Sequence, residues 1–559
     1  MARTTRRSVR LVLGFAILVA LQGCGGGAAP HAEHATETAA AGPRVIGNLG
    51  AYSHPVTTSS PEAQRYFDQG LRLVYGFNHD EARLAFEQAG RIDPDCAMAW
   101  WGVAYSLGSN YNQPGDPERD RQAYAAMEKA KAAAPKASER DQAYVAALAV
   151  RYASDAPADR RHLDEAYAAA MGDLARRFPD DLDAQTMYAE SLMDLQPWDL
   201  WTADGKPKGR TVEIVTVLEG VLARDPQHPG ANHYYIHAVE ASKSPERALP
   251  AADRLRAMSL TGAGHLVHMP SHIYIRTGRY PDAYDANVEA AAADEAYIAK
   301  WKVEGVYPSM YYPHNVHFMY AAASFEGRGT EAISAARRVH GLVPIEMLPH
   351  MPMLEGFLAV PYFALARFGH WDEILAEPAP PADQGYVTGI WHYVRGLAYS
   401  AKGDPKQAKA ELAALDAIRA KAPKDWRPTE VNTGRALLGV ASDHLAGEIA
   451  AKAKRWNVAI RDLEAAVKLE DGLRYMEPPD WYLPMRQALG DVLLRAGRPR
   501  RAEAVFRQDL EHNRENGWAL RGLAQSLRRQ GKTAEAAQVE ERLSRAWARA
   551  DPGLVTAGG

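Results

Sequence analysis

The sequence predicts an all-α fold in which about twelve helical pairs stack into a solenoid between residues 62 and 548. Three observations predict it. Polar and apolar residues do not alternate with period two over a useful length, so strands are not expected. Small residues and prolines recur at fixed offsets in several copies of one pattern. After its leader the chain has roughly 500 residues, more than one compact core supports, which favours several domains or a repeat array.

Residues 1–23 are typical of an export signal. Four arginines between residues 3 and 10 precede the apolar stretch Leu11 to Leu21, which is too short to span a bilayer. The ending Leu21-Gln22-Gly23-Cys24 resembles the lipobox of bacterial lipoproteins. That resemblance implies that Cys24 is lipidated and anchors the mature chain to a bacterial membrane of the cell envelope, facing the periplasm or the exterior. An ordinary signal peptide with a chance cysteine is the alternative.

The composition of the mature chain excludes several classes of site. Residues 24–61, rich in Gly, Ala and His, are expected to form a lipidated tether, and residues 549–559 a flexible tail. Once Cys24 is acylated, Cys96 is the one remaining cysteine, so neither an intramolecular disulfide nor a cysteine-based metal site is expected. With a net charge of -4 and 24% charged residues, the sequence has no basic stripe, which argues against nucleic-acid binding.

One copy of the repeat is clear between residues 70 and 94. Ala82, Phe86, Ala89 and Pro94 follow Gly70 at offsets of 12, 16, 19 and 24. The small residues allow two antiparallel helices to touch, and the proline ends the unit. This pattern resembles the tetratricopeptide repeat (TPR) family. Further copies carry Gly396, Gly403 and Ala408; Gly447, Ala459, Leu463 and Ala466; Gly490, Gly497, Ala502 and Phe506; and Trp518, Gly522 and Ala534.

The resemblance implies an elongated, right-handed solenoid whose concave groove binds a peptide or a protein partner. It implies no particular reaction, because one fold serves many functions. Longer interruptions occur near residues 195–210, 296–312 and 376–388. Two segments, Pro197 to Trp201 and Tyr475 to Pro484, are denser in aromatic residues than a loop needs. We expect them to serve the structure, with lids or caps on the groove as the alternative.

Histidine is concentrated in the centre of the chain. Ten of the nineteen histidines lie in residues 228–350. Their spacing places the members of each group on one face of a helix. The groups are His233 with His237; His265, His268 and His272; and His314 with His317.

The repeat register predicts that the three groups share one surface. If the small residue of each second helix (Ala248, Ala283 or Ala332) is numbered 20, all seven histidines fall at positions 2, 5 or 9 of the first helix. In the TPR family these positions line the concave groove. Neighbouring first helices pack about 8–10 Å apart, so two imidazoles can reach one ion at about 2.0–2.1 Å each. The step from Ala283 to Ala332 is longer than one repeat, and its insertion can displace the third unit.

The shared register predicts a site for one or two divalent transition ions. Glu190 and Asp194 of the preceding unit, and Glu240 one turn after His237, are candidate acidic ligands or hydrogen-bond partners of the ligands. Imidazole suits several transition metals and carboxylate shifts the balance among them, so zinc, iron and copper all stay open. Tyr234 stands where a zinc protease of the His-Glu-x-x-His kind has its glutamate, so the region does not match that motif.

Two hypotheses of different classes follow. The first is a lipid-anchored binding protein whose histidine-lined groove takes a transition metal, a peptide or a protein. The second is a metal-dependent enzyme, a hydrolase or an oxidoreductase, in which an ion at the same histidines activates water or oxygen. We favour the binding protein, because the sequence has no phosphate-binding glycine loop, nucleophile elbow or dinucleotide fingerprint beside the candidate ligands.

Overall fold

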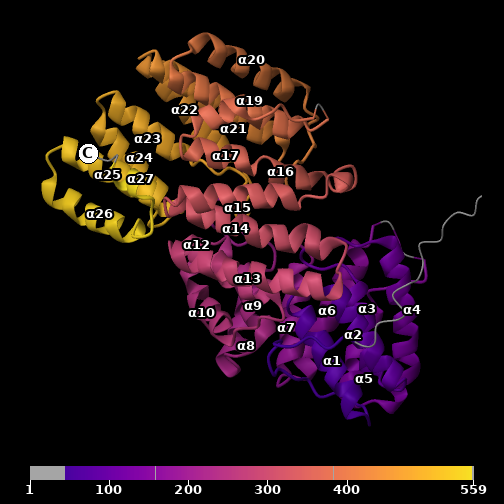
Figure 1. Ribbon diagram of the computed structural model, residues 1–559. Coiled ribbons are helices and arrows are strands. Elements are labelled where there is room, and N and C mark those ends of the chain that lie inside the picture. Colours follow the sequence, from indigo (N-terminus) through magenta and orange to yellow (C-terminus); the bar gives the residue numbers. More distant parts are fainter. Residues whose placement is uncertain (1–43, 156, 158, 382, 557–559) are drawn as a thin grey trace, which may run out of the picture. The chain divides into compact units, whose positions relative to one another are not determined.

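The computed structural model describes residues 44–155, 157, 159–381 and 383–556 (Figure 1). This part of the chain is all-helical; it contains no β-strand, only two isolated bridges between Asn110 and Gln113 and between Trp201 and Pro207. None of its helices is long and apolar enough to cross a membrane. The expected signal peptide, Cys24 and most of the expected tether lie outside the described residues.

The helices form twelve consecutive pairs, as the repeat pattern predicts, and the fold is a TPR-like α-solenoid. Pairs 1 to 6 are α1 (Pro61–Val74) with α2 (His79–Ile92), α3 (Ala97–Leu107) with α4 (Pro117–Ala133), α5 (Glu139–Ala149) with α6 (Arg161–Arg177), α7 (Leu182–Met193) with α8 (Thr211–Arg224), α9 (Pro229–Glu240) with α10 (Leu249–Met258), and α11 (Gly264–His268) continued by α12 (Pro270–Thr277) with α13 (Tyr280–Trp301).

Pairs 7 to 12 are α14 (Tyr312–Phe325) with α15 (Gly329–Leu342), α16 (Glu355–Leu358) continued by α17 (Val360–Arg367) with α18 (Trp371–Ala376), α19 (Gly385–Lys402) with α20 (Pro405–Lys421), α21 (Gly434–Lys452) with α22 (Trp456–Glu470), α23 (Met485–Arg495) with α24 (Pro499–His512), and α25 (Gly517–Arg529) with α26 (Thr533–Ala546). The short helix α27 (Pro552–Thr556) follows. Short 3-10 or π turns lie at Ala134–Lys136, Pro245–Ala248, Tyr307–Tyr311, Ile345–Met347 and Pro352–Leu354.

Local sequence signals set several of the helix starts. The side chains of Ser60, Asp116 and Asp181 each accept a hydrogen bond from the backbone N–H three residues further on. These caps satisfy donors that have no partner inside the helix. Proline occupies the first position of α1 and of α4, where its missing N–H costs nothing.

A phenylalanine from a second helix explains the spacing of the repeat glycines. The ring of Phe86 on α2 lies against Gly70 on α1 and Gly102 on α3, where an added Cβ would overlap the ring. The same contact recurs around Phe506 on α24. Each phenylalanine therefore wedges between the first helices of two successive pairs, and glycine on both sides provides the room.

Contacts in the array are not confined to neighbouring pairs. The Trp518 indole on α25 donates to the carbonyl of Ser324 at 2.8 Å, and the Trp547 indole, just after α26, donates to the carbonyl of Phe325 at 3.2 Å. The Tyr280 hydroxyl on α13 donates to the carbonyl of Arg514 at 2.8 Å. Pairs 11 and 12 are thus bonded to pairs 6 and 7.

The first half of the array also closes across its groove. The loop after α1 packs onto pairs 5 and 6, where the Phe77 ring lies 4.4 Å from the His233 ring and 5.4 Å from the His265 ring between centroids. The Tyr75 ring occupies the space beside Gly230, at the start of α9. The chain's own loop therefore fills the groove that the register argument expected to be open.

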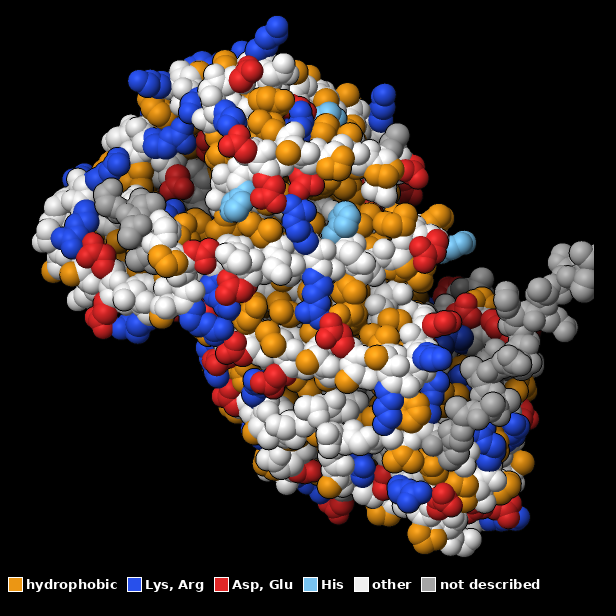
Figure 2. Space-filling model, viewed as in Figure 1, with side chains coloured by type: hydrophobic (Ala, Val, Ile, Leu, Met, Phe, Trp, Pro, Cys, Tyr) orange, Lys and Arg blue, Asp and Glu red, His pale blue; other side chains and the backbone are white. Residues whose placement is uncertain are grey.

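Charges of both signs are mixed on the face of the molecule shown in Figure 2, with no continuous stripe of Lys and Arg visible there. Surface ion pairs such as Arg337 with Glu373, 2.5 Å apart, contribute at most about 1 kcal/mol each. The fold is therefore held mainly by its apolar contacts, which form three successive core clusters along the chain.

Candidate metal centre

Six of the seven predicted histidines form one cluster. They lie on the first helices of pairs 5, 6 and 7: His233 and His237 on α9, His265 and His268 on α11, His272 on α12, and His314 on α14. Neighbouring ring centroids are 4.8 Å apart for His268 and His314 and 5.3 Å apart for His237 and His272. The repeat register therefore brings residues from three helical pairs to one place.

A proline divides the central histidine helix without changing the direction of its side chains. Pro270 begins α12, and Met269, which joins α11 to α12, keeps helical backbone angles of φ -51° and ψ -37°. His265, His268 and His272 therefore stay on one face, at the spacing of a continuous helix.

The cluster is buried, which corrects the expectation of an open, histidine-lined groove. His233, His268 and His272 have no exposed surface, and His237 and His265 are 2% exposed. His314 is half-buried. The loop carrying Tyr75 and Phe77 covers the cluster from pair 1, a contact between segments more than 150 residues apart that no local sequence signal indicates.

The δ nitrogens of four rings face hydrogen-bond acceptors outside the cluster. His233 Nδ1 lies 2.7 Å from the carbonyl oxygen of Tyr75, and His268 Nδ1 lies 2.6 Å from Asn287 Oδ1. His237 Nδ1 and His272 Nδ1 lie 2.8 Å and 2.5 Å from the two carboxylate oxygens of Glu240. Glu240 is therefore the one predicted acid that joins the cluster.

These acceptors place the ring proton on Nδ1 of His268 and His272. Asn287 Nδ2 donates to the carbonyl of Ala283 at 2.7 Å, so its Oδ1 is the atom that faces His268. Burial alone would raise the pKa of Glu240, but the two imidazoles beside it lower that pKa to about 2. Glu240 is therefore a carboxylate at neutral pH. Both partners can only accept, and each imidazole must donate.

Two ε nitrogens without protons then face each other. His268 Nε2 and His272 Nε2 are 2.8 Å apart. Two nitrogens bound to one ion at about 2.0–2.1 Å stand about 2.8–3.4 Å apart at angles of about 90–109°, the shortest distance belonging to the smallest angle. The observed distance lies at the short end of this range, whereas two lone pairs at 2.8 Å repel each other when nothing lies between them.

Three further donor atoms extend the cluster toward α9. His233 Nε2 and His265 Nε2 are 3.2 Å apart, and the buried His237 Nε2 has no hydrogen-bond partner. Within this cluster, donor atoms that lie within 4.8 Å of one another come from three trios: His233, His237 and His265; His268, His272 and His314; and His237, Glu240 and His272.

Burial keeps these imidazoles neutral. It lowers the pKa of His233, His265, His268 and His314 well below the ordinary 6.5, and neighbouring histidines lower it further. Neutral imidazole is the form that binds a metal. These four rings are thus uncharged nitrogen donors at neutral pH.

His317 lies apart from the cluster. Its ring contacts Phe357 and Tyr482, with centroids 5.4 Å and 5.2 Å away, and burial lowers its pKa to about 3. The insertion before α14 (residues 296–312) lengthens the step between the two units, and α14 brings only His314 to the other rings.

Glu190 and Asp194 are also absent from the trios of converging donors. Asp194 accepts from the Arg151 guanidinium at 2.9 Å, and both residues are buried. Burial and the neighbouring Asp194 raise the pKa of Glu190 well above its ordinary value. Pair 4 therefore places its two acids in a separate charged network with Arg151.

The sequence prediction missed Asn287, although the repeat register contains a signal for it. Asn287 stands four residues after the small Ala283, the place that Phe86 and Phe506 occupy after Ala82 and Ala502. A polar residue at a position that wedges between helices needs a hydrogen-bonding partner in the core. His268 is that partner.

A cavity of about 860 Å³ reaches the edge of the cluster. His237 and Glu240 line its inner end, while Trp198 and Tyr475 come from the two aromatic-dense segments. Glu477 also lines the cavity, and burial raises its pKa to about 7. The two segments thus form part of the wall around the approach to the histidines.

A second buried polar group fastens the segment before α1. Asp183 on α7 lies 2.6 Å from His54 Nδ1 and accepts hydrogen bonds from the hydroxyls of Tyr52 and Tyr75. Although burial favours the neutral acid, the hydrogen bonds from His228 and His54 lower the pKa of Asp183. Its partners include His54 at a sequence distance of 129 residues, so the sequence alone did not indicate this network.

No family model and no curated protein matches the sequence. Among solved structures, a human IFIT1 dimer with m7Gppp-AAAA covers 88% of this chain and 91% of that chain at 12% identity and a TM-score of 0.31. Yeast Tom70 covers 87% and 92% at 11% identity and a TM-score of 0.26. The P58(IPK) TPR domain covers 84% and 99% at 12% identity and a TM-score of 0.20. Similarities at this level carry no information on function.

Proposed function

We propose that this protein binds transition-metal ions at the buried histidine cluster, with zinc, iron and copper as candidates. His268, His272 and His314 would hold one ion, and His233, His237 and His265 a second. The donor atoms of each trio lie within 4.8 Å of one another. Imidazole donors suit these three metals, whereas magnesium and calcium prefer oxygen.

The close approach of two ε nitrogens, whose δ nitrogens both face acceptors, is the observation that carries the proposal. His268 and His272 donate from Nδ1 to Asn287 and Glu240, so their Nε2 lone pairs meet at 2.8 Å. A cation between them would remove the repulsion. A proton shared by the two rings would also do so, and the elemental analysis below distinguishes a metal from a proton. Hydrogen bonds from the outer ring nitrogen to a carboxylate or an amide oxygen are typical of histidines that ligate metals.

A metal-dependent enzyme, hydrolase or oxidoreductase, is the second candidate. One observation favours it: the cavity of about 860 Å³ ends at His237 and Glu240, which gives a small molecule access to the edge of the cluster. A peptide or protein partner, which the repeat resemblance implies, would need another surface, because the histidine face of pairs 5 and 6 is buried.

The metal proposal is tested by elemental analysis of the mature, tag-free protein after incubation with each metal and dialysis. We expect at least one equivalent of one of the three metals to be retained. Replacing His268 and His272 together by Gln should remove most of it, while His317→Gln, the matched control outside the cluster, should keep it. Unchanged circular dichroism would show that helix content is intact. Wild-type protein that retains no stoichiometric metal would rule the proposal out.

We further propose that lipid on Cys24 holds the protein in the bacterial envelope. The motivation is the Leu-Gln-Gly-Cys ending of the apolar leader. Acyl chains contribute about 0.8 kcal/mol for each buried CH₂, so Cys24→Ser should move the protein from the membrane fraction to the soluble fraction. Immunoblots of the two fractions measure this. A Cys24→Ser protein that stays with the membranes would show that another anchor acts.

A further inference from the structure

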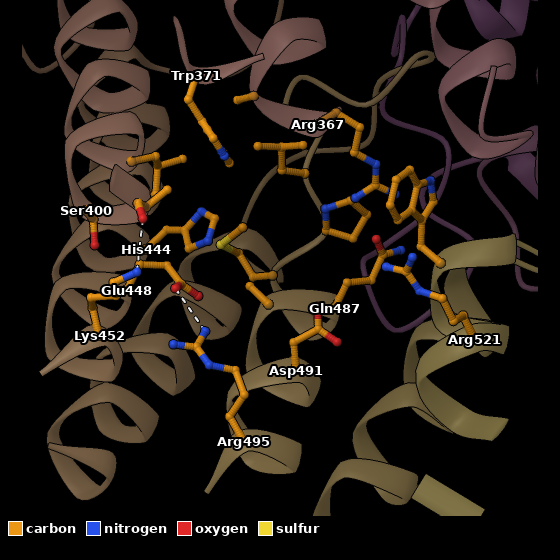
Figure 3. A pocket seen from close by; sticks show the side chains of 18 of the residues that line it. Arg367, Trp371, Ser400, His444, Glu448, Lys452, Gln487, Asp491, Arg495 and Arg521 are labelled. Carbon is orange, nitrogen blue, oxygen red and sulfur yellow. Dashed lines mark hydrogen bonds and ion pairs between the residues drawn. The ribbon is translucent and has the colours of Figure 1, made fainter. Parts of the chain in front are cut away.

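A cavity of about 560 Å³ lies in the second half of the array, among the first helices of pairs 8 to 12 (Figure 3). Residues of α17, α18, α19, α21, α23, α24 and α25 and of the segment just before α23 line it, and none of them belongs to the histidine cluster. Its size is within the range of small-molecule sites in proteins. The cavity can therefore be considered separately from the metal centre.

Two arginines without ion pairs form one side of this cavity. The guanidinium carbon of Arg367 lies 4.1 Å from the centroid of the Trp518 ring, and that of Arg521 lies 5.2 Å from it. Within the described chain, neither guanidinium has a hydrogen-bond or ion-pair partner, and the buried Nε of Arg367 is unsatisfied. Burial lowers the pKa of Arg367 to about 10, which still leaves it positively charged at neutral pH.

A carboxylate faces the same space. Asp491 on α23 lines the cavity and has no hydrogen-bond partner among the described residues. Burial raises its pKa to about 6, while Arg521 and Arg367 oppose that rise. The opposite charges thus attract each other across the cavity without forming a direct pair. By contrast, Glu448 and Arg495 elsewhere in the lining are paired at 3.2 Å, as Figure 3 shows.

Part of the remaining lining is apolar and suits an apolar group. Trp371, Leu397, Leu483 and Phe506 belong to this part, beside polar residues such as His444 and Gln487. Arg367 Nε is buried without a hydrogen-bond partner, and Asp491 is exposed in the cavity wall. A ligand carboxylate would give the guanidinium the acceptor it lacks, and a ligand ammonium group would pair with Asp491. A purely anionic ligand would meet Asp491, and a purely cationic ligand would meet two arginines.

We propose that this cavity binds a small zwitterion of the amino-acid class. Its carboxylate would lie at Arg367 and Arg521, its ammonium group at Asp491, and its side chain against the apolar wall. Arginine pairs well with a carboxylate because its planar fork of donors matches the two oxygens. The proposal is independent of the metal centre, because the two sites share no residue.

The test is a thermal-shift screen of the mature full-length protein against each of the common amino acids, followed by calorimetric titration of the amino acid with the largest shift. We expect at least one to bind. Its amide, which lacks the carboxylate, and its N-acetyl derivative, which lacks the ammonium group, should each bind about tenfold or more weakly, because each loses a charge-assisted hydrogen bond.

Variants locate the site. Arg521→Gln and Asp491→Asn should each weaken binding about tenfold or more. Lys452→Gln is the matched control, because Lys452 lines the cavity but already donates to the carbonyl of Ala401 at 2.9 Å, and its affinity should equal that of wild type. Replacing His268 and His272 should also leave binding unchanged. The proposal fails if no amino acid binds, or if the N-acetyl derivative or the amide binds as tightly as its parent.

Discussion

Each histidine ring has two nitrogens, and the partner of one determines what the other can do. In this protein the acceptors Asn287 and Glu240 hold the protons of His268 and His272 on the outer side of the cluster. The inner nitrogens are therefore free to share a cation. A single amide in α13 thus determines the chemistry of a ring in α11.

Removing that amide should weaken metal binding. Asn287→Leu takes away the acceptor of His268 Nδ1, so the ring can place its proton on Nε2 and lose the ligand lone pair. Loss of such an outer partner typically lowers metal affinity about 10–100-fold. Competition with a chelator of known affinity measures the change. Asn287→Asp keeps an acceptor and should bind as wild type does; equal affinity of the Leu variant would contradict the assigned tautomer.

His317 should make the stability of the protein pH-dependent. Its pKa is lowered to about 3 by burial, against an ordinary 6.5, so on acidification the unfolded chain takes up a proton first. The stability contributed by this neutral group is full above pH 6.5 and is lost as the pH falls from 6.5 toward 3.

Between pH 6 and 4, His317→Gln should therefore lower the slope of unfolding free energy against pH by about 1.4 kcal/mol per pH unit. Urea titrations at a series of pH values measure this slope. The exposed Val212 provides the control substitution, Val212→Ala, which removes no titratable group and should leave the slope as it is in wild type. An unchanged slope in His317→Gln would mean that His317 is protonated in the folded protein.

At the scale of the helix, glycine sets how closely successive pairs approach. An added Cβ at Gly70 would lie 2.7 Å from the Phe86 ring, and Gly490 makes the corresponding contact with Phe506. The phenylalanine ring belongs to the second helix of the same pair. Because the ring also touches the next first helix, one residue couples three helices.

Replacing Gly490 by Leu should separate α23 from α24. Overpacking of this kind costs about 1–3 kcal/mol, and the midpoint of urea unfolding measures it. In the double variant Gly490→Leu with Phe506→Ala, the new leucine side chain has room. The loss of unfolding free energy should therefore be smaller than the sum of the losses in the two single variants. Additive losses would show that the ring does not limit the approach of the helices.

The same wedge position explains one feature of the metal centre. In pair 6 Asn287 replaces the phenylalanine, and His268 stands opposite it. The repeat position that packs helices together in pairs 1 and 11 thus holds, in pair 6, the residue that orients His268. Packing and site chemistry use the same register of the repeat.

At the scale of the whole described chain, closure distinguishes this array from an extended one. In an open solenoid each unit contacts only its neighbours, and unfolding can proceed from the ends. Here Trp518 and Trp547 bond to the end of α14, and Gly329 N donates to the Asp551 carboxylate at 3.0 Å. The last pairs are thereby coupled to the middle of the array.

The closure also makes the metal centre possible. The loop of Tyr75 and Phe77 crosses to pairs 5 and 6 and excludes water from the histidines. Without this cover the imidazoles would titrate near their ordinary pKa and compete with water for an ion. Burial therefore comes from contacts between pairs 1 and 5, while the ligands come from pairs 5, 6 and 7.

The sequence by itself determined the repeat, the number of pairs and the register of the histidines. These properties depend on residues within one or two units, such as Gly70, Phe86 and Pro94, so their spacing can be read directly. The prediction that His233, His237, His265, His268, His272 and His314 come together rests on the same local periodicity. The structure brings these six together.

Only the tertiary structure decided which acids join the cluster, that His317 does not, and that the groove is closed. Glu190, Asp194 and Glu240 look alike in the sequence, but Arg151 pairs with Asp194 from pair 3, and only Glu240 faces two imidazoles. The contacts of Arg151 with Asp194 and of His272 with Glu240 join residues 43 and 32 positions apart. They depend on how the pairs curve and where loops cross, and short-range periodicity carries no information about either.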